Sequence, residues 1–191
     1  MISRLGWPHE NPVGWIFTSA GSFIRALMFL IVAGYYREKF SSIHKPIAKL
    51  IYVLLIACSI AGFLLGAIPN FNTPDKIFMR IHAINAFILF PGLYLTSFFM
   101  AVLMAFSRKL TRNRISLPRK VPIIYFIVLL YGATCMFLLL AFAIGLEGQF
   151  IFDPLIPAIL QPPVWEWQCF MAELFLLVVP AYVLPEKIDL V

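Results

Sequence analysis

Five long apolar segments constrain the fold of this 191-residue chain more than any other feature of its sequence. They cover residues 13–36, 50–68, 77–106, 121–146 and 165–184. Each reaches the length of about 20 predominantly apolar residues that a bilayer-spanning helix needs. Because backbone groups cannot remain unpaired in hydrocarbon, and because these segments lack the alternation of barrel strands, helices are the predicted form. The sequence therefore predicts an all-α, polytopic transmembrane helical bundle with five spans.

The composition favours a membrane environment over an aqueous one. Hydrophobic residues make up 62% of the chain, charged residues make up 13%, and the mean hydropathy is +0.91. A soluble domain has about half apolar and about a quarter charged residues, so this chain carries too few charges to cover a water-exposed surface. A soluble enzyme, a nucleic-acid-binding domain and a disordered tail are excluded. We expect residues 1–191 to form a single transmembrane domain, in an endomembrane or the plasma membrane if the source is eukaryotic.

The distribution of positive charge predicts the orientation. Six of the 15 Lys and Arg residues lie between the third and fourth spans, in a segment that we call the basic loop. Its members are Arg108, Lys109, Arg112, Arg114, Arg119 and Lys120. Residues 37–49 are also basic, whereas residues 147–164 contain acidic residues and no Lys or Arg. Basic loops stay on the cytoplasmic side, so the N-terminus is predicted outside or in the lumen and the C-terminus in the cytoplasm.

Two further expectations follow from these loops. The basic loop should meet anionic lipid headgroups at the membrane surface, and not nucleic acid. No cleavable signal peptide is visible before the first span, so that span is expected to act as its own insertion signal.

Two charged residues lie inside predicted spans. Arg25 is twelve residues into the first span, and Glu173 is eight residues past Trp165. At about 1.5 Å per residue, they lie about 18 Å and about 12 Å below the outer surface. A charge near the bilayer centre costs about 2.5–3.5 kcal/mol on insertion scales and normally faces a partner inside the bundle. We predict that Arg25 and Glu173 form an internal pair between the first and last spans.

Other polar residues lie near the outer end of the predicted bundle. Arg80, His82 and Asn85 lie on the third span, and Glu166 lies on the fifth, seven residues before Glu173 and on the same helix face. Two interpretations stay open. These residues could line a polar pocket for a lipid headgroup or substrate, open to the outer side, or they could serve only to fix the register of the helices.

Neither the cysteines nor the histidines predict a metal or redox centre. Cys58, Cys135 and Cys169 all lie in apolar segments, and an odd number argues against a disulfide framework. Only His9 and His82 would lie on the outer side, which is too few for a zinc or haem site. No P-loop, nucleophile elbow or dinucleotide fingerprint is present. No metal and no cofactor are predicted, and the sequence leaves open whether any reaction is catalysed.

Three short motifs resemble the FRAG/DRAM/SFK family of membrane proteins, which includes GPI-anchor remodelling factors. The first is Ser22-Phe-Ile-Arg25-Ala-Leu, continuing to Tyr35-Tyr36, which is similar to the helix after the family's first lumenal loop. The second is Gly66-Ala-Ile-Pro-Asn70-Phe71 followed by Ile81-His82 and by Asn85-Ala-Phe-Ile88, and the third is Glu166-Trp167. The family's Arg, His and Glu-aromatic positions correspond here to Arg25, His82, Glu166 and Trp167.

The resemblance implies possible functions, but the chain differs from the family in its number of spans. Members are linked to GPI lipid remodelling, to phosphoinositide-kinase scaffolding and to autophagy. They typically have six spans, and this chain begins where the family's second span would start, which puts in doubt any activity that needs the first.

The leading hypothesis is an integral membrane protein that binds a lipid, or assists its remodelling, through a GPI-type or phospholipid headgroup. Its outer or lumenal pocket would be lined by Arg25, His82, Asn85, Glu166, Trp167 and Glu173. Its partners would be membrane lipids and other membrane proteins. The alternative is a non-catalytic scaffold or accessory subunit of a larger membrane complex. Transport is disfavoured, because five spans without a repeat or a broken helix pair lack the usual transporter signature.

Overall fold

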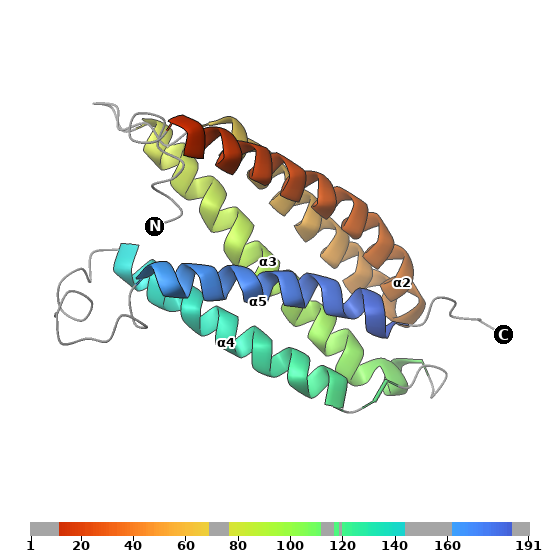
Figure 1. Ribbon diagram of the computed structural model, residues 1–191. Helices are drawn as coiled ribbons and strands as arrows, with labels where there is room; N and C mark the ends of the chain where they lie inside the picture. Colours follow the sequence, from red (N-terminus) through yellow and green to blue (C-terminus); the bar gives the residue numbers. More distant parts are fainter. Residues whose placement is uncertain (1–11, 69–76, 112–116, 119, 144–161, 185–191) are drawn as a thin grey trace, which may run out of the picture.

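Four α-helices make up the part of the chain that the structure, a computed structural model, describes: residues 12–68, 77–111, 117–118, 120–143 and 162–184 (Figure 1). They are α2 (Pro12–Ala67), α3 (Ile77–Leu110), α4 (Lys120–Ala143) and α5 (Pro162–Val183). These ranges contain no strand, which confirms the all-helical class. Three helices are long and apolar enough to cross a membrane: α2, the segment Arg80–Ser107 of α3 and the segment Lys120–Leu138 of α4. The apolar segment Gln168–Val183 of α5 is shorter.

Helix α2 consists of two arms that meet at His44, the one residue inside it with non-helical backbone angles (φ −158°, ψ 100°). Pro46 causes this break, because it has no N–H for the carbonyl of Ser42 and its ring crowds that carbonyl. The His44 Nδ1 atom accepts a hydrogen bond from the Ile47 N–H at 3.4 Å, as an N-cap side chain does. The prediction of a loop over residues 37–49 is therefore wrong. Apart from His44 this segment is helical, and it joins the first two predicted spans directly.

The two arms of α2 run antiparallel along a seam of small residues. The Ser59 hydroxyl donates a hydrogen bond to the Ala26 carbonyl at 2.7 Å, and a Cβ atom built on Gly62 would lie 3.3 Å from the Cβ of Ala26. Further along, Gly66 packs against the backbone of Ser19 at the opposite end of the first arm. Small residues are common between membrane helices because they let the backbones approach closely.

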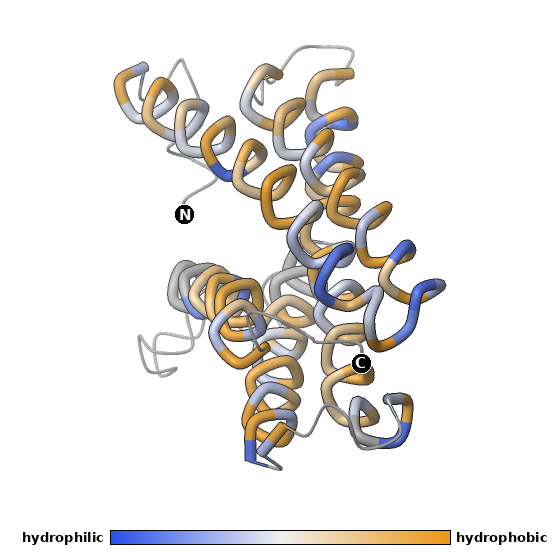
Figure 2. The backbone as a smooth tube through the Cα atoms, turned by 90° about the vertical axis from the view of Figure 1, so that its right-hand side faces the viewer, coloured by the Kyte–Doolittle hydropathy of each residue, from blue (hydrophilic) through white to orange (hydrophobic). Residues whose placement is uncertain are grey.

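Helix α3 packs against both α2 and the α4–α5 pair. Its main packing partner is α2, while α4 packs mainly on α5, and α3 also contacts both α4 and α5. Figures 1 and 2 show α2 on one side of α3 and the α4–α5 pair on the other. The turn of α2, the end of α3 and the start of α4 lie at one end of the molecule, where the described basic residues Arg37, Lys45 and Lys109 are found.

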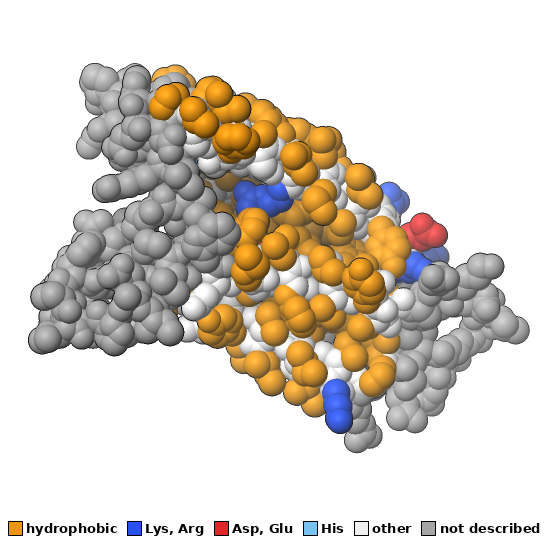
Figure 3. Space-filling view, in the orientation of Figure 1, with side chains coloured by type: hydrophobic (Ala, Val, Ile, Leu, Met, Phe, Trp, Pro, Cys, Tyr) orange, Lys and Arg blue, Asp and Glu red, His pale blue; other side chains and the backbone are white. Residues whose placement is uncertain are grey.

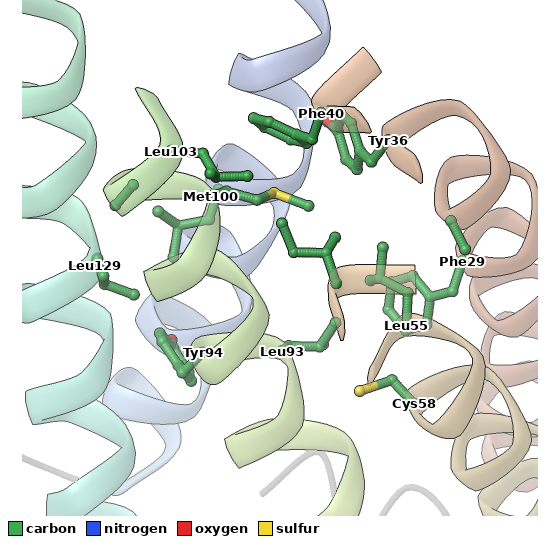
Figure 4. Packing of buried hydrophobic residues seen from close by; sticks show 14 of the residues in the cluster. Phe29, Tyr36, Phe40, Leu55, Cys58, Leu93, Tyr94, Met100, Leu103 and Leu129 are labelled. Atoms are coloured by element: carbon green, nitrogen blue, oxygen red, sulfur yellow. The ribbon is translucent and has the colours of Figure 1, made fainter. Parts of the chain in front are cut away.

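The buried core lies between all four helices, with Leu55, Leu93, Met100 and Tyr125 among its fully buried side chains (Figure 4). Outward-facing side chains are also apolar. Phe17, Ile31 and Tyr182 are 73%, 74% and 85% exposed, and Figure 3 shows hydrophobic side chains over most of the described surface. Such a surface suits lipid and not water.

Four tyrosines attach α5 to the other helices through its carbonyl groups, one of them Tyr35 of α2, whose hydroxyl donates to the Ala181 carbonyl at 3.3 Å. The other three come from three different helices. Pro180 leaves the Leu176 carbonyl without its usual helical N–H donor, and the Tyr125 hydroxyl donates to that carbonyl at 2.7 Å. The Tyr36 hydroxyl donates to the Leu177 carbonyl, and the Tyr94 hydroxyl donates to the Cys169 carbonyl at 3.2 Å. These bonds come from α4, α2 and α3 respectively, so they place α5 and its one acidic side chain in the described range against the bundle.

Candidate functional site

Arg25 lies in the first arm of α2, where its guanidinium lies over two aromatic rings and makes no hydrogen bond among the described residues. Its guanidinium carbon lies 5.8 Å from the ring centroid of Phe90 on α3 and 5.8 Å from that of Phe170 on α5. Its Nε atom is buried and has no hydrogen-bond partner. Contacts of a guanidinium with aromatic faces offset part of its desolvation cost, but they leave its N–H groups without oxygen acceptors.

Glu173 projects from α5 into the same region and is only 4% exposed. Its Oε1 atom is buried and has no hydrogen-bond partner. A carboxylate oxygen without a donor is expensive in a low-dielectric interior. The segment that carries Glu173 is held by the Tyr94 and Tyr125 bonds to α5, so the acid cannot leave this position without breaking them.

The two charges interact electrostatically without a direct contact. The Arg25 and Glu173 side chains interact electrostatically with each other, and both interact electrostatically with Cys58 of the second arm. Within the described part of the chain, neither Arg25 nor Glu173 makes a hydrogen bond or an ion pair. The predicted internal pair therefore differs in detail: Arg25 and Glu173 interact through space, but their charged atoms are too far apart for an ion pair.

His82 and Asn85 lie earlier on α3, and no hydrogen bond joins either of them to Arg25 or Glu173. The Asn85 amide is buried and donates to the Ile81 carbonyl of its own helix at 3.0 Å, a local role. His82 lies beside the backbone of Ile68, and its Nδ1 atom is buried without a partner. Arg80 is exposed.

Several predicted residues fall wholly or partly outside the described residues. The backbones of Glu166 and Trp167 belong to the first turns of α5, but their side chains are not described. Of the basic loop, Arg112, Arg114 and Arg119 lie outside the described ranges, as do residues 1–11 with His9, residues 69–76 with Asn70 and Phe71, and residues 144–161. Arg108 and Lys109 lie in the last turn of α3, and Lys120 begins α4, so these three are helical and not part of a loop.

Sequence reasoning missed the aromatic neighbours of the site. Phe90 and Phe170 are two of 19 phenylalanines, and no spacing distinguishes them from those that face lipid. Elsewhere on α2, Trp15 has a buried indole Nε1 atom with no acceptor among the described residues. Among the described residues, four side chains therefore have a buried polar atom without a partner: Trp15, Arg25, His82 and Glu173.

In the described ranges, no group of three or more His, Cys, Asp or Glu side chains could hold a metal ion. All three cysteines are buried, and none of them forms a disulfide. Comparisons of the chain with protein-family models, with curated proteins and with solved structures found no match.

Proposed function

We propose that this chain is a five-span membrane protein that binds the headgroup of a phosphate-bearing lipid next to Arg25, and assists the remodelling of that lipid. The lipid would be of the GPI type, as in the family that the motifs resemble, or a phospholipid. The single observation that carries the proposal is Arg25: a guanidinium in the middle of an apolar helix, in contact with two rings and with no hydrogen bond or ion pair among the described residues.

Physical cost supports a ligand at this position. A buried charge normally finds a hydrogen-bonded counter-charge, and Glu173 is near enough to supply one but does not make contact. A phosphate has the geometry that a guanidinium binds best, with two parallel N–H···O bonds. Figure 3 shows Lys or Arg atoms in a recess between α2 and α5, among hydrophobic side chains, where a lipid headgroup could enter with its acyl chains along the apolar surface.

The proposed topology counts each arm of α2 as one span, with α3, α4 and α5 as the other three. The N-terminus lies outside and the C-terminus in the cytoplasm. The basic residues at the turn of α2 and at the α3–α4 connection support this orientation, since both lie at one end of the molecule.

Native mass spectrometry of the protein released from nanodiscs of defined phospholipid mixture tests lipid binding. We expect the wild type to retain phosphate-bearing lipid, and Arg25→Gln to reduce the retained fraction. A hydrogen bond to a charged group contributes about 1.5–3 kcal/mol, so affinity should fall about tenfold to a hundredfold.

The control is Arg37→Gln, which removes the same charge at the other end of the same arm, where Arg37 lies over the ring of Tyr52. Arg25→Gln should fold, because it removes a charge without a hydrogen-bond partner from an apolar helix, and thermal unfolding checks this. Equal retention by wild type and Arg25→Gln would refute the proposal. Copurification of a stoichiometric membrane complex with no retained lipid would also refute it, in favour of the scaffold alternative.

A further inference from the structure

The site places two groups of opposite formal charge, Arg25 and Glu173, near each other with no hydrogen bond or ion pair between them. Arg25 and Glu173 interact through space, yet each has a buried polar atom without any partner. The Phe90 and Phe170 rings both contact the Arg25 guanidinium carbon at 5.8 Å. Desolvating two charges is repaid only by close contact and full hydrogen bonding, so this arrangement leaves both groups without a partner among the described residues and open to a ligand.

The sign of the two charges restricts the ligand. A purely anionic group on Arg25 would add a negative charge beside Glu173, in a region where repulsion is poorly screened. A lone cation on Glu173 would repel Arg25 for the same reason. A group that carries one charge of each sign, in the opposite order along its length, would be attracted at both ends.

The unpartnered carboxylate oxygen restricts the cation. Glu173 Oε1 is an acceptor that needs a donor. A primary ammonium has three N–H donors, whereas a quaternary ammonium has none and relies on aromatic faces. The aromatic rings of this site contact the arginine, and no ring contact of Glu173 is recorded among the described residues.

We propose that the site recognises a zwitterionic headgroup of the phosphoethanolamine type, with its phosphate on Arg25 and its primary ammonium on Glu173. This inference rests on the proposed function and names the lipid class for the same site. The shared chemistry is a phosphate linked to a primary ammonium, and it occurs both in phosphatidylethanolamine of the bilayer and in free phosphoethanolamine.

The test measures lipid retention by the intact protein in nanodiscs that contain equal amounts of phosphatidylethanolamine, phosphatidylcholine and phosphatidylglycerol. We expect the wild type to retain phosphatidylethanolamine about tenfold over the other two, as one charge-assisted hydrogen bond allows. Glu173→Gln should abolish this preference while still retaining phosphatidylglycerol through Arg25. The matched control Glu38→Gln, an exposed acid in the first arm of α2, should keep the preference.

A second measurement needs no variant, in case Glu173→Gln does not fold. Phosphatidylethanolamine carrying zero, one, two or three N-methyl groups is offered to the wild type, and retention should fall most at the last methylation, which removes the final N–H donor. Equal retention along this series would overturn the inference. Added phosphoethanolamine distinguishes the source: displacement of the lipid means that the headgroup alone is recognised, and no displacement means that the lipid is required, and either result agrees with the proposed chemistry.

The two proposals fail differently. If the wild type prefers phosphatidylglycerol and loses it in Arg25→Gln, the lipid-binding function stands and the zwitterionic ligand is refuted. If no lipid depends on Arg25, both are refuted.

Discussion

The close approach of the second arm of α2 to α3 at Gly92 gives a quantitative test of the fold. A Cβ atom built on Gly92 would lie 2.7 Å from the Sγ atom of Cys58, with no other atom within 4 Å apart from the glycine's own neighbours. Cys58 is 1% exposed, so its sulfur has little room to move away. Gly92→Ala should therefore be destabilising, although alanine favours a helix by about 1 kcal/mol over glycine.

The size of the effect follows from the overlap. Overpacking by one methyl group typically costs about 1–3 kcal/mol, and Gly92→Ala should be less stable than Gly34→Ala by that amount, because nothing lies within 4 Å of a Cβ on Gly34. Cys58→Ala removes the single clashing atom. In that background Gly92→Ala should raise the free energy of unfolding instead of lowering it, giving a coupling energy of about 1–3 kcal/mol.

Unfolding of the four variants in mixed micelles titrated with a denaturing detergent measures these free energies. The same cycle with Gly34→Ala in place of Gly92→Ala serves as the control and should be additive. Coupling below about 0.5 kcal/mol between positions 58 and 92, which is the usual limit of additivity, would contradict the packing of α2 on α3 described above.

Two other contacts lead to stability predictions that thermal unfolding in detergent checks. Tyr125→Phe should cost about 1–3 kcal/mol by leaving the Leu176 carbonyl unpaired, and much less in a Pro180→Ala background, where the new N–H can bond that carbonyl; an equal cost in both backgrounds would show that the tyrosine acts only by packing. His44→Ala should cost about 1 kcal/mol by removing the cap of the second arm, whereas His44→Asn should be nearly neutral; equal losses in the two variants would contradict the capping role.

Much of the architecture could be predicted from the sequence, because the length and hydropathy of a segment are local properties. A run of about 20 apolar residues must satisfy its backbone internally whatever its neighbours are, and α3 and α4 follow the predicted spans closely. The same reasoning identified Arg25 and Glu173 as unusual, since a charge in such a run is costly in any fold. Hydropathy alone does not predict the helix on both sides of His44, because the basic residues 37–49 lower the local hydropathy as a loop does, although all but His44 are helical.

The detail of the site could not be read from the sequence, because it depends on how helices distant along the chain rotate and pack. Helical spacing places Arg25 on α2 and Glu173 on α5, but the distance between their side chains depends on the seam of small residues inside α2 and on the tyrosine bonds that position α5. That packing decides whether the two side chains form an ion pair or stay without partners among the described residues. Likewise, which two of the 19 phenylalanines contact the guanidinium is fixed by helix rotation, since an aromatic side chain has the same local signature whether it faces lipid or the interior.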